Sequence, residues 1–216
     1  MENRGIILID GSHLFASILK VRDNRPEYKN KKLNLTKLTE ALTRKWGLNL
    51  GYLVRAKYYF KKTDKRLKEL LTIPKSNEPG TKNHWQIVEC GETLTGGVPI
   101  EQIVKLDQKY RDYFPRSEKG LDIKLTCDAL LLAATGRISN FVFLINDRDY
   151  MPLLDSIGSL GGNVYITALD SKEETQEKIT NLSDLFLTLD NELPFIFELT
   201  KPEPPKQTLS QESPES

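Results

Sequence analysis

The sequence predicts an α/β domain in which helices cover both faces of a mostly parallel central sheet. Three observations predict this fold class. Short apolar runs alternate with segments of helical apolar spacing through residues 1–200, this region contains no internal repeat, and the chain of 216 residues is long enough to bury a substantial core. We therefore expect one layered domain over residues 1–200.

Five apolar, aromatic or β-branched runs predict the strands. The first run ends at the pair Asp10-Gly11, and turn residues surround the third. Continuous apolar runs of this length are typical of parallel strands that are buried on both faces. In chain order, the expected strands lie at residues 6–9, 52–60, 85–89, 141–145 and 164–168.

Six segments between and after these runs predict helices. In the second helix, one apolar face is expected to contain Leu35, Leu38, Ala41, Leu42 and Trp46. In the fourth helix, which begins at Leu121 and closes near Gly136, the expected buried face contains Ile123, Cys127, Leu130, Leu131 and Ala134. The other expected helices lie at residues 12–21, 64–71, 150–160 and 182–189, and residues 96–120 give no clear pattern.

The remaining features set the context of this domain. Residues 201–216 contain four prolines, three glutamates and three serines, so burial cannot offset the entropy lost on ordering, and we expect a disordered tail. The apolar run at residues 6–9 is far too short to span a membrane, and we expect a cytoplasmic protein. Neither Cys90 nor Cys127 has a second ligand at metal-binding spacing, and we expect both thiols to be reduced and buried.

The net charge of +1 conceals an uneven distribution of charge along the chain. Residues 20–82 contain 18 Lys and Arg against 6 Asp and Glu, whereas residues 83–216 contain 12 against 22. A basic segment of this size attracts a polyanion such as nucleic acid. A lysine-rich face that is simply solvated explains the count equally well.

Aspartates follow two of the expected strands. Asp10 follows the first strand, and Asp147 and Asp149 follow the fourth. In open α/β sheets, ligands bind outside the carboxyl ends of the strands. A single aspartate at such a position is usually a helix N-cap, but this set, with Asp122 and Asp128 in the intervening helix, exceeds what capping requires.

Such a set of carboxylates indicates a site for Mg²⁺ or Mn²⁺ and phosphoryl chemistry. On a regular helix, Asp122 and Asp128 would point about 120° apart, so both cannot bind one ion from the helix interior. Either Asp122 reaches the site from the start of the helix, or one of the two residues is structural.

Other sites that use an aspartate after the first strand are excluded by spacing. A haloacid-dehalogenase-type phosphatase needs an aspartate where Ser12 stands, and an integrin-type metal site needs a serine where Leu14 stands. The glycine pattern of a dinucleotide-binding fold is absent after Gly11. The two histidines, His13 and His84, belong to no nucleophile triad.

Three segments together resemble the NYN family of PIN-like nucleases. They are IILIDGSHLF at residues 6–15, KGLDIKLTCDAL at 119–130 and FLINDRDYMPL at 143–153, in the order that the family has, and LGGNV at 160–164 is a softer match. The resemblance covers roughly residues 4–190. Two positions depart from the family pattern: His13 stands where asparagine is usual, and Ile145-Asn146 replaces a small hydroxyl residue and glycine. The lost hydroxyl weakens the case for full activity.

The resemblance implies a Rossmann-like or PIN-like three-layer sandwich and a metal-dependent ribonuclease that uses one or two Mg²⁺ or Mn²⁺ ions. Asp10 and Asp147 would be the primary ligands, Asp128 and Asp149 would complete or orient the ligand set, and Asp122 is the fifth acidic candidate. The expected partner is RNA, with DNA as the alternative polymer, and a homo-oligomer or a protein partner stays open. A catalytically inactive binding or regulatory module is the alternative function, and the departures at His13 and Ile145 favour it.

Basic and aromatic residues near these aspartates are the expected nucleic-acid contacts. Tyr58, Tyr59 and Phe60 lie among the basic residues, where they would stack bases or pack in the core. His13 is either a substrate contact or a local hydrogen-bonding residue. The expected contacts to the nucleic acid are Ser12, His13, Arg55, Lys57, Lys61, Lys62 and Arg148.

Overall fold

The structure is a computed structural model that describes residues 4–47, 55–61, 66–73, 85–95, 98–99, 102, 105, 116–173 and 177–199. The expected tail and the side chain of Lys62 lie outside the described residues. Among the helices that the structure describes, none is long and apolar enough to cross a membrane.

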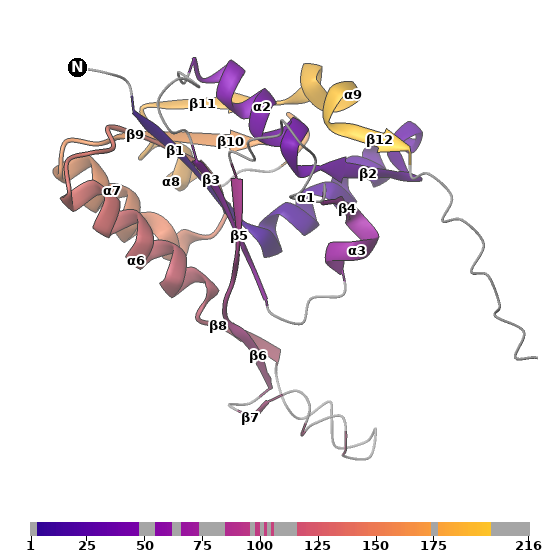
Figure 1. Ribbon diagram of the computed structural model, residues 1–216, viewed down its shortest axis with the longest axis horizontal. Helices are drawn as coiled ribbons and strands as arrows, with labels where there is room; N and C mark the ends of the chain where they lie inside the picture. The colour runs from indigo at the N-terminus through magenta and orange to yellow at the C-terminus, as the bar shows by residue number, and fades with distance from the viewer. Residues whose placement is uncertain are drawn as a thin grey trace, which may run out of the picture.

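Six parallel strands form the central sheet, in the order β11-β10-β9-β1-β3-β5 (Figure 1). The chain builds outward from β1 in both directions, because β3 and β5 pair on one side of it and β9, β10 and β11 follow on the other. The boundary between β1 and β9 is therefore the topological switch point, where ligands bind in folds of this kind. The strands are β1 (Gly5–Asp10), β3 (Arg55–Phe60), β5 (Trp85–Glu89), β9 (Asn140–Leu144), β10 (Asn163–Ala168) and β11 (Leu185–Thr188).

Helices cover both faces of this sheet, which confirms the predicted layered α/β fold (Figure 1). Alternate residues of β1 enter different cores, because successive side chains of a strand point to opposite faces: Ile7 and Ile9 face one layer, and Ile6 and Leu8 face the other. The first layer contains α1 (Gly11–Asn24), α2 (Leu35–Lys45) and α9 (Leu193–Ile196), and the second contains α6 (Leu121–Ala134), α7 (Met151–Ser159) and α8 (Glu177–Thr180).

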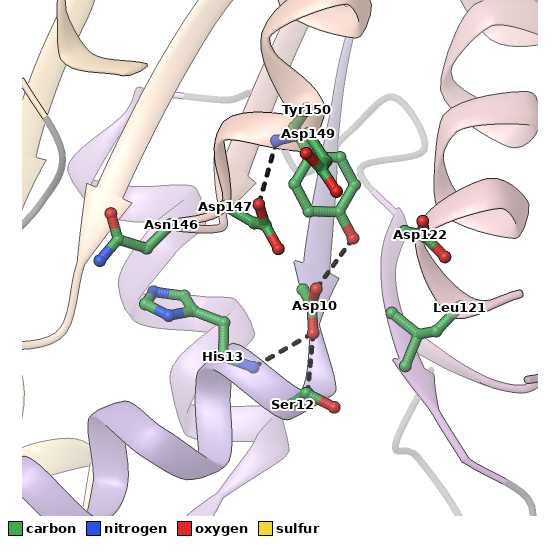
Figure 2. Close-up of a pocket in the computed structure, with 9 residues that line it drawn as sticks. All are labelled: Asp10, Ser12, His13, Leu121, Asp122, Asn146, Asp147, Asp149 and Tyr150. Atoms are coloured by element: carbon green, nitrogen blue, oxygen red, sulfur yellow. Dashed lines mark hydrogen bonds between the residues drawn. The ribbon is translucent and has the colours of Figure 1, made fainter. Parts of the chain in front are cut away.

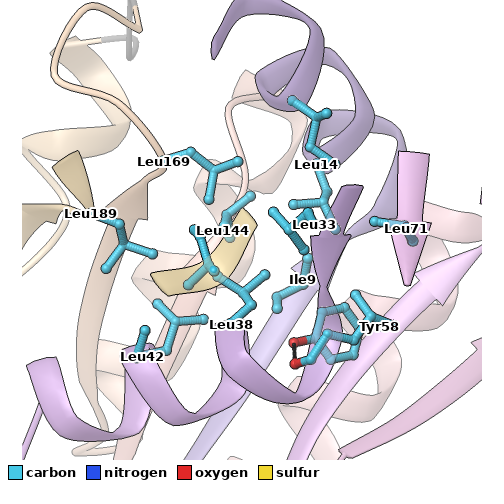
Figure 3. Close-up of a cluster of buried hydrophobic side chains, with 14 of the residues drawn as sticks. Ile9, Leu14, Leu33, Leu38, Leu42, Tyr58, Leu71, Leu144, Leu169 and Leu189 are labelled. Atoms are coloured by element: carbon cyan, nitrogen blue, oxygen red, sulfur yellow. Dashed lines mark hydrogen bonds between the residues drawn. The ribbon is translucent and has the colours of Figure 1, made fainter. Parts of the chain in front are cut away.

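The first core is large and mostly aliphatic (Figure 3). Leu38 and Leu42 of α2, on the expected apolar face, pack with Ile9 and Leu144 of the sheet and with Leu14 of α1. One buried polar pair is satisfied within this core, because the hydroxyl groups of Thr39 and Tyr58 lie 2.8 Å apart. Tyr58, Tyr59 and Phe60 are all buried. Of the two roles left open by the sequence, core packing is therefore confirmed for all three, and base stacking is excluded.

Short segments outside the central sheet form two small sheets that the sequence did not indicate. Strands of two to four residues give too little periodicity to be distinguished from loops. One sheet has the order β12-β2-β4, with β12 (Phe197–Leu199), β2 (Lys31–Asn34) and β4 (Leu71–Thr72). The other has the order β7-β6-β8, with β7 (Val98–Pro99), β6 (Glu92–Thr95) and β8 (Arg116–Lys119). The remaining short elements are η1 (Pro26–Tyr28), α3 (Arg66–Leu70), η2 (Arg148–Tyr150) and η3 (Asp190–Glu192).

Three sequence predictions are corrected by the structure. Residues 182–189 do not form a helix, because they contain β11, the edge strand of the sheet, which pairs with β10. The buried face of α6 consists of Leu121, Leu125, Ala129 and Ala133, whereas Ile123, Leu131 and Cys127 are exposed. Cys90 is only half-buried, so neither thiol is fully buried, and neither forms a disulfide bond within the described part of the chain.

Candidate active site

A pocket of about 310 Å³ lies at the switch point of the sheet, where β1 and β9 end (Figure 2). Loops and helix starts that follow these two strands supply most of its wall, and α6 supplies the rest. Four of the lining side chains are carboxylates. The residues that line the pocket are Asp10, Ser12, His13, Leu121, Asp122, Asn146, Asp147, Asp149 and Tyr150.

Asp10 is the last residue of β1 and the N-cap of α1. Its Oδ1 atom accepts hydrogen bonds from the backbone N–H groups of Ser12, at 2.8 Å, and His13, at 3.1 Å. These bonds satisfy two of the unpaired donors at the start of the helix. The capping role considered from the sequence is therefore real, and it fixes a carboxylate at the wall of the pocket.

Tyr150 holds the other oxygen of Asp10. Its hydroxyl donates a hydrogen bond of 2.8 Å to Asp10 Oδ2 (Figure 2). Burial of the phenol, together with the charge of Asp10, raises the pKa of Tyr150 far above its ordinary value. Tyr150 therefore keeps its proton and acts as a donor that orients Asp10. No role at the site was predicted for this residue from the sequence, although it directly follows Asp149.

Asp147 and Asp149 enter the pocket from the segment that follows β9. Asp147 is the N-cap of η2, and its Oδ1 accepts a hydrogen bond of 3.0 Å from the backbone N–H of Asp149. Both residues are exposed, and Asn146 and Tyr150, on either side of them, also line the pocket. Ile145 is buried in the core, where an apolar side chain fits.

The structure separates the two aspartates of α6. Asp122 lies in the first turn of the helix and lines the pocket. Asp128 does not line it, because its carboxylate contacts Lys57 Nζ at 2.9 Å, Lys124 Nζ at 2.6 Å and the Tyr59 hydroxyl at 3.0 Å. Burial alone would raise the pKa of Asp128, but the hydrogen bonds from Lys124 and Lys57 hold it below the ordinary value.

His13 lies in the first turn of α1 and lines the pocket. Its Nε2 is 3.3 Å from Oε1 of Glu173, whose side chain is 2% exposed. Burial lowers the pKa of His13 to about 4, with a smaller effect from Lys20. The imidazole is therefore neutral near pH 7. No sequence pattern indicates a role for Glu173, which lies in the segment after β10.

The basic residues that were expected to contact nucleic acid lie in different environments in the structure. Lys57 is paired with Asp128 and does not line the pocket. Arg148 is exposed in η2, between two aspartates of the pocket. Lys61 follows β3, which neighbours β1, so it lies at the same edge of the sheet. The side chain of Arg55 is not among those that the structure describes.

The donor set of the pocket fits a hard divalent cation in its chemistry, because it consists of carboxylate oxygens. The carboxylates do not converge in the arrangement seen here: among the described residues, no group of three or more His, Cys, Asp or Glu side chains is placed to hold one metal ion. A cation held here would be bound by one or two of these carboxylates and complete its coordination with water, as is usual for Mg²⁺.

A comparison with protein families gives one match for this chain. The family model described as NYN domain matches residues 4–190, which is most of the chain and includes every residue that lines the pocket. No curated protein and no solved structure matches significantly.

Proposed function

Because this chain belongs to the NYN domain family, a family of PIN-like nucleases, we propose that it is a metal-dependent endoribonuclease. The observation that carries the proposal is that Asp10, Asp122, Asp147 and Asp149 line one pocket at the switch point of the sheet. Four carboxylates in one pocket repel each other, and a divalent cation is the usual neutralising partner.

In this proposal the four pocket aspartates hold one or two cations. When bound, Mg²⁺ or Mn²⁺ lowers the pKa of water and stabilises the charge that develops on the phosphate during hydrolysis. The backbone of Ser12 and His13 and the hydroxyl of Tyr150 fix Asp10, the central carboxylate. Asp128 is left out of this set, because its two lysine partners already neutralise it.

The substrate is proposed to be an RNA strand that crosses the sheet edge. Lys61 and Arg148 are at that edge and are suited to phosphate contacts, and Ser12 lines the pocket. Lys57 is assigned no phosphate contact, because Asp128 engages it. DNA is the alternative polymer, since phosphates are common to both nucleic acids.

A nucleic-acid-binding module without catalysis is the second candidate. The observation that favours it is that, in the described part of the chain, no three metal-ligating side chains converge. In addition, Asp10 Oδ2 already accepts a hydrogen bond from the Tyr150 hydroxyl, and a cation bound to this oxygen would have to share it with Tyr150. Under this reading, the basic residues would bind the nucleic acid and the aspartates would contribute little.

Cleavage assays with matched variants separate the two candidates. Labelled single-stranded and hairpin RNA and DNA are incubated with the full chain in Mg²⁺, Mn²⁺ or EDTA. The test variant is Asp147→Asn, and the control is Asp155→Asn, an exposed aspartate of α7 that does not line the pocket. We expect metal-dependent cleavage of RNA that Asp147→Asn lowers at least a hundredfold, on the order of what loss of a key electrostatic group costs.

The control decides how a loss is interpreted. Asp155→Asn should cleave like the wild type, and circular dichroism should show that both variants are folded. Undiminished cleavage by a pure preparation of Asp147→Asn would rule out the proposed site. Binding of RNA without cleavage in any metal would instead establish the second candidate.

A further inference from the structure

The outward face of α6 is apolar. Ile123, Cys127 and Leu131 follow one another at intervals of four residues, and Ile123 is 61% and Leu131 67% exposed. Cys127 and the nearby Ala134 are exposed as well. We refer to these four residues as the apolar stripe. Single exposed apolar residues are common on protein surfaces, but a contiguous row of them on a helix that is apolar all round indicates a surface that is covered by a partner.

The apolar stripe lies on the side of α6 that points away from the sheet. The opposite side, which contains Leu125 and Ala129, packs on the sheet, and α7 lies beside α6 (Figure 1). On a helix of ~3.6 residues per turn, Asp122 is about 140° from Cys127. An interface along the stripe therefore does not include the side of α6 that lines the candidate active site.

The apolar stripe has the geometry of a surface that fits a second copy of itself. Ile123 and Leu131 are each four residues from Cys127, so the two large side chains are placed symmetrically about it. Two copies related by a two-fold axis at Cys127 run antiparallel, and Ile123 of each copy then faces Leu131 of the other. Side chains four residues apart form a ridge on a helix, and two such ridges interdigitate when the helices cross at about 50°.

The charges beside the apolar stripe also suit a second copy. Lys124 and Asp128 lie about 60° and 100° from Cys127 on the same flank of the helix, and they pair at 2.6 Å. The two-fold axis places Lys124 of one copy on the same side of the contact as Asp128 of the other, so opposite charges meet there. This flank of α6 carries one cation and one anion, whereas an anionic membrane or a nucleic acid would select an excess of cations.

We propose that α6 is the interface of a symmetric dimer of this chain, in which the apolar stripes of two copies pack antiparallel about Cys127. The dimer does not depend on the proposed nuclease function, and it gives a role to a surface that the candidate active site leaves unused. One helix face buries less area than a standard interface, so we expect a dissociation constant on the order of 10 µM. At the lower concentrations used to follow unfolding by fluorescence, the chain is then monomeric.

The first test measures the oligomeric state of the full chain. Sedimentation velocity at concentrations from about 1 to 300 µM should show the wild type passing from monomer to dimer. Leu131→Lys should raise the dissociation constant at least about tenfold, because it buries an unpaired charge at the contact. The control is Leu19→Lys, which should dimerise like the wild type, since Leu19 is 45% exposed on α1, in the layer on the other face of the sheet.

A mixture of two variants tests the antiparallel pairing. Ile123→Glu and Leu131→Lys should each be monomeric alone, because every dimer of one variant buries two unpaired charges. Mixed in equal amounts, they should form a heterodimer in which the introduced carboxylate meets the introduced ammonium, while the two unchanged apolar side chains meet at the other end. A parallel arrangement would give no such recovery. Circular dichroism should show that both variants are folded, as expected for substitutions at exposed positions.

Cys127 reports directly on the two-fold axis. In Cys90→Ser, Cys127 is the single thiol of the chain. A short bismaleimide should therefore link two copies of this variant into a covalent dimer. The matched control moves the thiol to an exposed position of α1, in the triple variant Cys90→Ser/Cys127→Ser/Asp23→Cys, which should give little covalent dimer.

Several results would overturn the inference. They are a dimer that Leu131→Lys does not weaken, a mixture of the two variants that stays monomeric, and a wild type that is monomeric at every concentration. For a monomeric wild type, slow labelling of Cys127 by a maleimide would show that another segment of the chain covers the stripe, and rapid labelling would show that the stripe is open. These measurements use no nucleic acid, so the proposed function stands or fails separately.

Discussion

Asp122 and Asp128 belong to one helix, yet their carboxylates have different surroundings. Asp122 lines the pocket, whereas Asp128 faces β3, where Lys57 and Tyr59 donate to it. Six residues on a helix correspond to about 600° of rotation, so the two side chains cannot share one face. The pairing of Asp128 with the sheet fixes the rotation of α6, and this rotation directs Asp122 toward the pocket.

We predict that the same substitution affects stability at one aspartate and cleavage at the other. Asp128→Asn should lower the free energy of unfolding by about 2 kcal/mol, because Lys57 loses a charged hydrogen-bond partner in a half-buried place. Asp122→Asn should leave stability nearly unchanged and lower cleavage. Urea denaturation followed by tryptophan fluorescence and the RNA cleavage assay measure the two effects.

The cleavage activity that Asp128→Asn retains shows whether Asp128 has a structural or a catalytic role. When Asp128→Asn is assayed well below its unfolding temperature, it should retain most of the cleavage activity. A variant that stays as stable as the wild type but loses all cleavage would show that Asp128 belongs to the catalytic set after all.

Much of the site was predictable at this scale, since Asp10, Asp122, Asp147 and Asp149 were all named from strand ends and helix starts, and the structure brings them to one pocket. The choice between Asp122 and Asp128 was not predictable, because it depends on which lysines α6 meets in the fold. Glu173 was not predictable either, since its role depends on a contact with His13 across 160 positions of sequence.

Gly11 permits the start of α1 to pack closely against β3. A Cβ atom at this position would lie 2.2 Å from Cδ1 of Phe60 and 2.3 Å from the carbonyl oxygen of Tyr59. The start of α1 therefore packs directly against β3, at a distance that only glycine permits. This close approach holds the helix N-terminus, and with it the backbone donors to Asp10, at the edge of the sheet.

We predict that Gly11→Ala is strongly destabilising, by about 3 kcal/mol, because the added methyl group must displace backbone or the buried Phe60 ring. The matched control is Gly158→Ala in α7, where the added Cβ meets nothing within 4 Å. That substitution should leave stability unchanged or raise it by up to about 1 kcal/mol. Thermal unfolding of both variants is the measurement, and equal melting temperatures would contradict the close approach.

The buried face of α6 provides a second prediction about an element. Leu125 is fully buried against the sheet, whereas Leu131 is 67% exposed. Leu125→Ala should cost about 2–5 kcal/mol, and Leu131→Ala should change the free energy of unfolding by less than about 0.5 kcal/mol. If chemical denaturation gave the reverse order, the orientation of this helix would be wrong.

The elements themselves were predictable to different degrees. The strands at residues 6–9, 85–89, 141–145 and 164–168 were located from their apolar and β-branched residues. The buried face of α6 was not, because this helix is apolar on both sides and its periodicity does not select one. Residues 182–189 were taken for a helix, since the pairing of β11 with β10 that makes them a strand is a tertiary contact.

At the scale of the whole molecule, part of the uneven charge of the chain is used in ion pairs within the fold. Basic residues of the first third pair with acidic residues far along the sequence: Arg44 with Glu192, Lys37 with Glu198 and Lys57 with Asp128. The basic segment is therefore less available to a polyanion than its count of charges indicates. Ion pairs between this segment and acidic residues such as Glu192 and Glu198 connect the N-terminal and C-terminal parts of the domain.

Arg25 pairs with two aspartates of the C-terminal part of the domain. Its guanidinium group contacts Asp170 at 2.9 Å and Asp190 at 2.7 Å, and Asp190 also accepts hydrogen bonds from the backbone N–H and the hydroxyl of Ser171. Burial opposes the charged form of Asp190, but hydrogen bonds, among them those from Thr188 and Ser171, outweigh it and lower the pKa far below 3.8. When the pKa of a carboxyl group is lower in the folded state than in the unfolded state, the group stabilises the fold at pH values above its pKa in the unfolded chain. This stabilisation is lost as the pH falls toward the pKa of the folded state.

We therefore predict that Asp190→Asn lowers the free energy of unfolding by about 1 kcal/mol at pH 7, and that its difference from the wild type shrinks as the pH falls below 3.8. The reason is that the unfolded chain takes up a proton at Asp190 in this range while the folded chain resists it. Urea denaturation at several pH values from neutral to acidic measures the difference. Asp155→Asn, at an exposed position of α7, is the control and should show little effect at any pH. A difference for Asp190→Asn that stays constant down to the acid limit of the folded state would contradict the prediction, because it would show that this long-range pair stabilises the fold through packing and not through charge.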